Sequence, residues 1–125
     1  MLDDSPVQLA SYCSLRTERH LDTVTIWLTG EFDLACEERF QEEVGSVLDS
    51  LVGTLVLDLR GLQFIDSTGL RMLIQIDAAA RSDGFDFVVF CGNGHVRRVL
   101  GETGLDGVLP VVDPSGVVAA SDSPV

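Results

Sequence analysis

The sequence predicts a single α/β domain in which an N-terminal β-hairpin joins a mostly parallel sheet with helices packed on it. The chain has 125 residues, of which 46% are hydrophobic, enough for one domain with a substantial core. From residue 24 onward, strand-like and helix-like segments alternate, and no internal repeat or linker interrupts them. We expect residues 1–6 to be a flexible start, residues 7–113 the domain and residues 114–125 a loose tail.

The first two strands are expected to form the hairpin. Residues 7–15 carry apolar side chains separated by polar ones, and residues 24–28 are rich in β-branched and aromatic side chains. The polar segment 16–22 between them predicts the turn. Asp33 follows the second strand and is a suitable N-cap, because its carboxylate accepts hydrogen bonds from free backbone N–H groups.

An amphipathic helix is expected after Asp33, with Gly53 as its stop. Apolar residues recur there at helical spacing and define one face. That face consists of Phe40, Val44, Val47, Leu48 and Leu51. The other faces carry Glu37, Glu38, Glu42 and Glu43. A solvated surface is the simpler interpretation of these glutamates, and a docking surface is the alternative.

A buried strand, a crossing segment and a second helix form the centre of the chain. Residues 54–58 are mostly apolar and predict a short strand, whereas the Ala, Leu and Met content of residues 70–81 favours a helix. The crossing places Asp66, Ser67 and Thr68 at the helix N-terminus. In open α/β sheets the segments beyond the carboxyl ends of the strands carry the chemistry. A hydroxyl at this position is presented to solvent or to a partner.

The remaining segments complete the sheet. Gly84 is expected to end the second helix, and residues 85–90 predict a strand. Asn93 is a candidate N-cap for a short third helix that ends at Gly104. Residues 108–112 are a last extended piece, which Pro110 restricts to a sheet edge or to an unpaired position.

Four segments of this chain together resemble the STAS family, and more narrowly the bacterial anti-sigma factor antagonists. They are residues 30–33, 55–59, 64–70 and 99–105, within a similarity that runs from about residue 9 to about residue 112. The most specific segment is residues 66–70, Asp-Ser-Thr-Gly-Leu, in which the family's phosphoacceptor directly follows the aspartate. The resemblance therefore assigns the phosphoacceptor to Ser67. After Asp113 the chain departs from the family, which usually closes with a longer amphipathic helix.

The resemblance implies a phosphorylation-switched binding module and not an enzyme. The unmodified protein would bind an anti-sigma factor that is also a serine kinase, and would thereby release a sigma factor. Phosphorylation of Ser67 would end this binding, and a phosphatase would restore it. Asp33, Asp66, Thr68 and Gly69 are expected beside Ser67 on the partner-binding surface. Helix capping is the alternative role of the two aspartates, and Thr68 is the competing acceptor.

Two other functions stay open. One is a phosphorylation-independent STAS scaffold in a stress-signalling or lipid-transport complex. The other is a response-regulator receiver phosphorylated at Asp58, because residues 55–60 resemble the strand that carries the phosphoaccepting aspartate of that family. The acidic pair and the late lysine of a receiver have no suitable counterpart here.

Composition excludes several other classes. A formal net charge of −12 and the absence of lysine argue against nucleic-acid binding, because a phosphate backbone would be repelled. Neither a Gly-x-Ser-x-Gly nucleophile motif nor a P-loop is present, so no catalytic residue is assigned. Three widely spaced cysteines and the isolated His20 and His95 predict no disulfide framework, metal site or cofactor. No signal peptide or membrane-spanning segment is recognisable, so a cytoplasmic protein of undetermined oligomeric state is expected.

Overall fold

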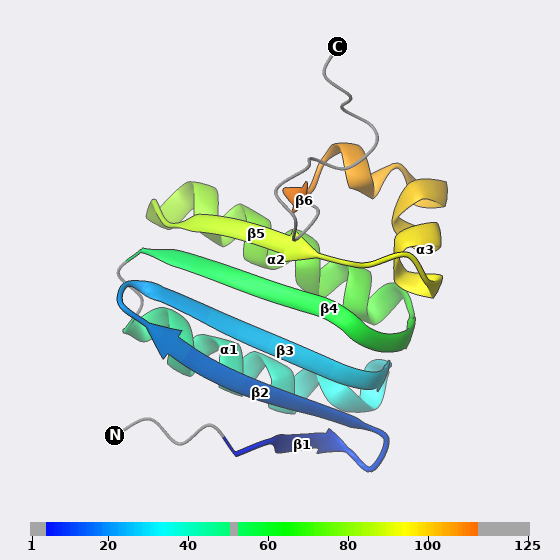
Figure 1. Ribbon diagram of the computed structural model, residues 1–125, viewed down its shortest axis with the longest axis horizontal. Helices are drawn as coiled ribbons and strands as arrows, with labels where there is room; N and C mark the ends of the chain where they lie inside the picture. Colours follow the sequence, from blue (N-terminus) through cyan, green and yellow to red (C-terminus); the bar gives the residue numbers. More distant parts are fainter. Residues whose placement is uncertain (1–4, 51–52, 113–125) are drawn as a thin grey trace.

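The computed structural model describes residues 5–50 and 53–112 as one sheet with helices packed against it (Figure 1). The elements are β1 (Val7–Ala10), β2 (Cys13–His20), β3 (Thr23–Phe32), the 3₁₀ turn η1 (Leu34–Cys36), α1 (Glu37–Asp49), β4 (Thr54–Ile65), α2 (Ser67–Asp83), β5 (Asp86–Phe90), α3 (His95–Thr103), the 3₁₀ turn η2 (Leu105–Gly107) and β6 (Val111–Val112). The predicted tail, residues 114–125, and most of the predicted flexible start lie outside the described residues.

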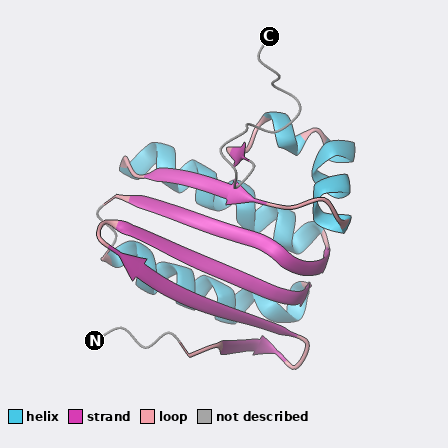
Figure 2. Cartoon of the chain, in the orientation of Figure 1, coloured by secondary structure: helices cyan, strands magenta, loops and turns pink. Residues whose placement is uncertain are grey.

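The sheet confirms the predicted fold class. Its strand order is β1-β2-β3-β4-β5-β6, so each strand lies beside its neighbours in the sequence. β1, β2 and β3 pair antiparallel, whereas β3, β4, β5 and β6 pair parallel. Helices α1 and α2 cover one face of the sheet, and α3 stands beside the carboxyl end of β4 (Figures 1 and 2). The carboxyl ends of β3 and β4 therefore meet the start of α2.

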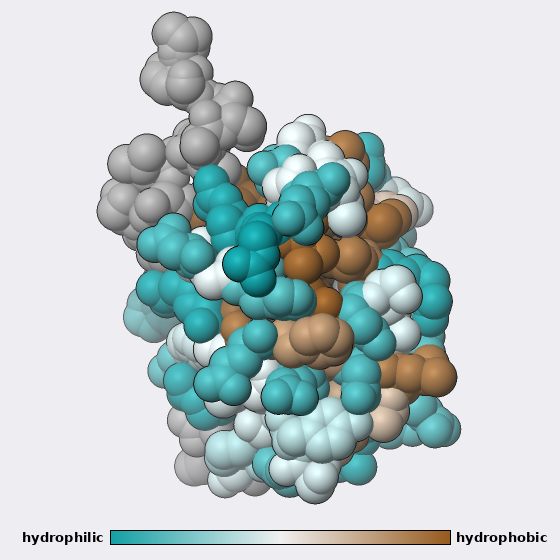
Figure 3. Space-filling model, turned by 90° about the vertical axis from the view of Figure 1, so that its right-hand side faces the viewer, coloured by the Kyte–Doolittle hydropathy of each residue, from teal (hydrophilic) through white to brown (hydrophobic). Residues whose placement is uncertain are grey.

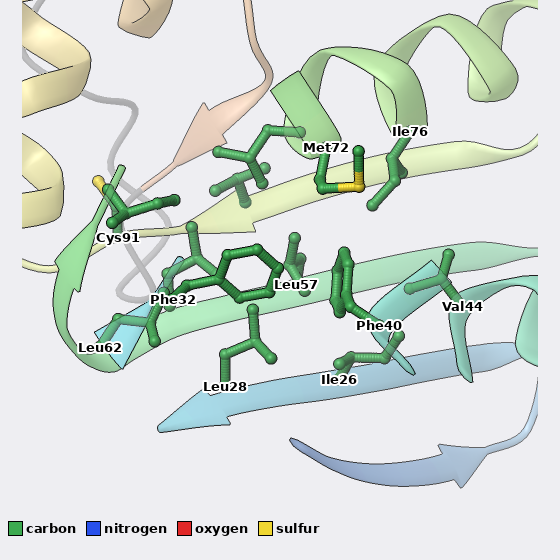
Figure 4. Close-up of a cluster of buried hydrophobic side chains, with 14 of the residues drawn as sticks. Ile26, Leu28, Phe32, Phe40, Val44, Leu57, Leu62, Met72, Ile76 and Cys91 are labelled. Atoms are coloured by element: carbon green, nitrogen blue, oxygen red, sulfur yellow. The ribbon is translucent and has the colours of Figure 1, made fainter. Parts of the chain in front are cut away.

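The core lies between the sheet and helices α1 and α2 (Figure 4). Ile26 and Leu57 point from adjacent strands toward Phe40 of α1 and Met72 of α2. Phe32 packs edge-on against Phe40, with ring centroids 5.1 Å apart. Each fully buried side chain of this size contributes about 1.5–3 kcal/mol through removal of apolar surface from water. Phe32 is the last residue of β3, and this contact holds the end of the strand against α1.

The predicted hairpin turn at residues 16–22 is wrong. Most of this segment belongs to β2, which runs to His20 and pairs along its whole length with β3. Only Leu21 and Asp22 form the turn, with Leu21 at a φ of 58°. The face of β2 that points away from α1 and α2 needs no apolar residues. On β2, the Arg16 guanidinium lies 3.9 Å from the Trp27 ring centroid. Polar strand residues of this kind look like a turn in the sequence.

The predicted crossing segment at residues 59–65 is also a strand. β4 continues to Ile65, where it still pairs with Phe32 of β3. The pairing shifts register between Trp27 and Thr29 and again between Gly30 and Glu31. These bulges disturb the two-residue alternation that identifies a strand. As a result, α2 begins only two residues after β4 ends, with Asp66 between them.

Of the helix boundaries predicted at Gly53, Gly84, Asn93 and Gly104, two are confirmed and two are wrong. Gly84 and Gly104 end α2 and α3 in the left-handed conformation, as predicted. The prediction for Gly53 is wrong, because α1 ends at Asp49 with Ser50 as its C-cap. A Cβ on Gly53 would lie 2.5 Å from the carbonyl oxygen of Asp22, so a close approach of two chain segments occupies that position. Asn93 is not a cap either, because Gly94 precedes α3.

Candidate functional site

The candidate site is the pole of the molecule where β3 and β4 end and where η1 and α2 begin. Ser67 is the first residue of α2 and is exposed. Asp66 precedes it, and the backbone N–H of Asp66 donates to the carbonyl of Phe32 at 3.2 Å. This hydrogen bond joins the segment between β3 and η1 to the segment between β4 and α2. Asp33 and Ser67 therefore lie at the same pole. The structure thus brings the two aspartates and Ser67 to the same end of the sheet.

Asp66 acts as the N-cap of α2. One of its carboxylate oxygens accepts hydrogen bonds from the backbone N–H groups of Thr68 at 2.9 Å and Gly69 at 3.3 Å. Two donors that have no partner within the helix are thereby satisfied. The carboxylate also places a negative charge at the positive end of the helix dipole. Asp66 therefore fixes the conformation of the first turn of α2, which carries the exposed Ser67.

Asp66→Ala is expected to lower the free energy of unfolding by about 1 kcal/mol, because the two backbone donors lose their acceptor. Asp66→Asn keeps a side-chain oxygen at the cap and is the matched control, with an expected loss of only a few tenths of a kcal/mol. Urea denaturation followed by circular dichroism measures both values. Equal stability of the alanine variant and the wild type would contradict the capping role.

Asp33 is held by three groups from two parts of the chain. Its carboxylate accepts from the backbone N–H of Ala35 at 3.0 Å, which caps η1, and from the Cys36 thiol at 3.7 Å. The phenol of Tyr12, in the turn between β1 and β2, donates to both carboxylate oxygens at 2.9 and 2.8 Å. Sequence reasoning missed Tyr12, because the two residues are 21 positions apart and no local motif connects them.

The Tyr12 hydroxyl is expected to titrate near pH 12. Its hydrogen bond to Asp33 and the nearby carboxylate charge favour the neutral phenol and raise the pKa of Tyr12 from 10.0 to about 12. The folded protein therefore keeps a proton that the unfolded chain loses between pH 10 and pH 12. This contribution to stability is complete below pH 10 and declines as the pH rises through that window.

The chain offers a direct test, because Tyr12 is its only tyrosine. Phenolate absorbance recorded during an alkaline titration reports this one group. Asp33→Asn removes the carboxylate charge and should move the midpoint back toward 10. A wild-type midpoint near pH 10 in the folded protein would contradict the contact with Asp33.

Thr68 and Gly69 lie inside the molecule. Thr68 is only 6% exposed. A Cβ on Gly69 would lie 2.4 Å from Cγ1 of Ile65 and 3.0 Å from Cδ1 of Phe32, closer than side chains approach each other. Gly69 thus permits the first turn of α2 to rest on the ends of β3 and β4. Of the three consecutive residues 67–69, Ser67 alone is exposed at the surface.

Apolar side chains are exposed at the pole that carries Ser67. Leu34, one residue after Asp33, is 66% exposed, and Phe64, near the end of β4, is 40% exposed. The imidazole of His95 stacks on Phe64 with ring centroids 5.1 Å apart. Figure 3 views this pole and shows hydrophobic residues at the centre of the face, bordered by hydrophilic ones. Such an arrangement is typical of a protein–protein interface. Sequence reasoning missed Leu34 and Phe64 as surface residues.

A match to a known family model identifies the family of this chain. The sequence model described as "Mlab, STAS domain" matches residues 15–113, which include both aspartates of the pole and Ser67. The chain belongs to the STAS family.

Relatives of this STAS chain include regulators of sigma factors. An "Anti-sigma F factor antagonist" from Paenibacillus polymyxa is 26% identical over 100 residues, which are 79% of this chain and 86% of the relative. The crystal structure of an anti-sigma factor antagonist from Mycobacterium paratuberculosis has 25% identity and a TM-score of 0.66, over 79% of this chain and 84% of that one. The structure of the anti-sigma factor antagonist SpoIIAA in its unphosphorylated form has 22% identity and a TM-score of 0.67, over 79% and 86%, and supports the fold.

The sequence predicted Asp58 at the end of a short strand. In this STAS chain, Asp58 instead lies inside β4, which continues to Ile65. It is 3% exposed, and both carboxylate oxygens accept from Arg60, whose Nε lies 2.9 Å from Oδ1 and whose Nη2 lies 2.6 Å from Oδ2. Phosphoryl transfer to a carboxylate requires access of the phosphate donor to an oxygen. Asp58 is almost fully buried and Arg60 holds both of its oxygens, so the geometry argues against the receiver alternative.

Cysteines and histidines form no metal site in the part of the chain that the structure describes. Cys13, Cys36 and Cys91 are free and buried. Burial raises the pKa of all three thiols, that of Cys13 to about 12. Within residues 5–50 and 53–112, no helix has the length and apolar character needed to cross a bilayer.

Proposed function

We propose that this STAS protein is an anti-sigma factor antagonist whose binding is switched off by phosphorylation of Ser67. The observation that carries the proposal is an exposed serine at the first position of α2, directly after its capping aspartate and beside exposed apolar side chains. The resemblance to the family assigns its phosphoacceptor to this residue. The names of the relatives from Paenibacillus polymyxa and Mycobacterium paratuberculosis support an anti-sigma factor as the partner.

In the unmodified state the partner would pack on the pole that carries Leu34, Phe64 and Ser67. Asp33 and Asp66 would lie at the edge of this contact, where both are partly exposed. Thr68 and Gly69, which are buried, would contribute by holding Ser67 in place. Burial of exposed apolar side chains drives such an association, and a neutral hydroxyl at its centre is readily accommodated.

Phosphorylation would change this surface through local charge. A phosphoserine brings about −1.5 to −2 charges. The backbone N–H groups of Thr68 and Gly69 already donate to Asp66, so they are not available to the phosphate. The new charge would therefore remain on the surface, next to the carboxylate of Asp66. A partner that covers Ser67 would have to desolvate this charge, and binding would weaken.

The modification itself would be carried out by other proteins. The anti-sigma factor partner would be a serine kinase that transfers the γ-phosphoryl group of ATP to the Ser67 hydroxyl oxygen. The bond between that phosphorus and ADP breaks, and the hydroxyl proton passes to a base of the kinase. A phosphatase would hydrolyse the phosphoserine and restore binding. This chain would act as substrate and ligand without being an enzyme, in the cytoplasm where sigma factors and ATP occur.

The test is the intact mass of the purified chain after incubation with MgATP and each anti-sigma kinase of the source organism. Ser67→Ala and Thr68→Val are treated in parallel. We expect one added phosphate on the wild type and on Thr68→Val, and none on Ser67→Ala. A phosphate that persists on Ser67→Ala but disappears from Thr68→Val would move the acceptor to Thr68. No labelling by any kinase would refute the switch.

A second candidate function is a STAS scaffold that binds its partner regardless of phosphorylation. The family model that matches residues 15–113 supports this candidate, because it represents a STAS domain named for Mlab. Affinity capture with the wild type and with Ser67→Glu distinguishes the two functions. Partners retained equally by both proteins would support the scaffold, whereas partners lost only from Ser67→Glu would support the switch.

A further inference from the structure

A second surface lies between α1 and α2, away from Ser67. These helices leave an open groove of about 200 Å³ whose walls are largely apolar. It is lined by Phe40, Gln41, Val44, Gly45 and Leu48 of α1 and by Met72, Gln75, Ile76 and Ala79 of α2. Figure 4 shows Val44 and Phe40 facing Ile76 and Met72 across it. A cavity of about 150 Å³ already admits a benzene molecule, so this groove has room for a large apolar side chain.

Gly45 has no evident structural reason to be glycine. It lies in the middle of α1, where glycine costs about 1 kcal/mol relative to alanine. It is not among the described glycines with a positive φ, and a Cβ built on it would meet nothing within 4 Å. Neither backbone conformation nor packing within the described residues therefore requires it. Its effect is to leave the groove open at its middle, where another chain can approach α1 closely.

The α1 side of the groove is acidic. Glu38, Glu42 and Asp49 are exposed, and each lies three or four residues from Gln41 or Gly45, on the same side of the helix. Two neighbouring glutamates have arginine partners, Glu37 with Arg71 and Glu43 with Arg39. None of the ion pairs found among residues 5–50 and 53–112 involves these three acidic residues. Three uncompensated carboxylates therefore flank an apolar groove.

We propose that this groove binds a cationic amphipathic helix of a protein partner. An apolar side chain of that helix would lie over Gly45, and its Lys or Arg side chains would face Glu38, Glu42 and Asp49. Helix-in-groove binding uses apolar anchors of this kind, and the charges on both sides are complementary. A second copy of this chain is disfavoured as the occupant, because its own α1 would bring carboxylates against carboxylates.

The groove is separate from the Ser67 surface. The ion pair between Arg71 and Glu37, 2.7 Å long, links the first turn of α1 to α2 one turn after Ser67. The groove continues beyond this ion pair to Leu48 and Ala79. Binding there should not depend on the state of Ser67. The protein would then hold a second partner in both states of the proposed switch.

The experiment uses the full chain and a synthetic helical peptide of about 14 residues with leucines on one face and lysines on the other, roughly four turns. Fluorescence anisotropy measures its affinity for the wild type, Gly45→Leu, the neighbouring surface variant Ser46→Leu, and Ser67→Glu. A peptide with glutamates in place of the lysines tests the charge requirement. We expect Gly45→Leu to weaken binding of the Leu/Lys peptide by about tenfold or more, and Ser46→Leu and Ser67→Glu to leave it unchanged.

Backbone amide shifts upon addition of the Leu/Lys peptide should concentrate on Gly45 and Ala79. Equal affinity of Gly45→Leu and the wild type, equal binding of the Leu/Glu peptide, or shifts that map elsewhere would each overturn the proposal. Should Gly45→Leu not fold, Gly45→Ala replaces it, because its methyl group would meet no neighbour within 4 Å. Concentration-dependent self-association that Gly45→Leu abolishes would assign the groove to a second copy, against the proposal.

Discussion

Replacing Gly69 with valine is expected to lower the free energy of unfolding by about 3 kcal/mol. Even a methyl group at this position would lie 2.4 Å from Ile65 and 3.0 Å from Phe32. Those two side chains end β4 and β3 and are almost fully buried, so they have little space into which to move. The first turn of α2 would be pushed away from the sheet, and Asp66 and Ser67 would be displaced with it.

Urea denaturation of Gly69→Val and Gly45→Val gives a matched comparison. Both substitutions place the same β-branched residue in a helix, but a Cβ at Gly45 meets no atom within 4 Å. The Gly45 variant should therefore lie within about 1 kcal/mol of the wild type. Similar losses at both positions would show that helix propensity, and not packing against Ile65 and Phe32, sets the cost.

Ser67→Glu is expected to weaken binding of the anti-sigma factor by about two orders of magnitude, or about 3 kcal/mol, with little change in melting temperature. The side chain at position 67 is exposed, and an acidic residue is favourable in the first turn of a helix. The effect on the fold is therefore small. In the complex, the same charge would be covered by the partner beside Asp66 and would lose its hydration.

Isothermal titration of the anti-sigma factor with wild type, Ser67→Glu and Ser67→Gln separates charge from size. Ser67→Gln adds nearly the same bulk without the charge and should retain most of the affinity. Equal affinities of Ser67→Glu and the wild type would exclude an electrostatic switch at this residue. Equal losses in both variants would assign the effect to steric exclusion.

Features that depend on neighbouring residues could be predicted from the sequence. Asp33 and Asp66 cap the turns that follow them, and Gly84 and Gly104 end their helices, because these interactions reach only two to four residues along the chain. The fold class also followed from local patterns. Ser67 was assigned by family resemblance, and the structure adds that its side chain is exposed.

Features that depend on distant residues could not be predicted. β4 is more than twice as long as the apolar run 54–58 suggested, because its second half is specified by bulged pairing with β3. The bond between Tyr12 and Asp33 crosses from the first hairpin to the end of β3. Leu34 and Phe64 resemble core residues by type, and only the folded chain reveals that they are exposed.

The buried cysteines have a practical consequence. Thiol-reactive dyes attack thiolates, and at neutral pH Cys13, Cys36 and Cys91 are protonated and shielded from solvent. The native cysteines should therefore react little with such dyes. A single cysteine placed at an exposed site such as Ser46 would carry one fluorophore, and partner exchange at either surface could be followed in real time without removal of any native residue.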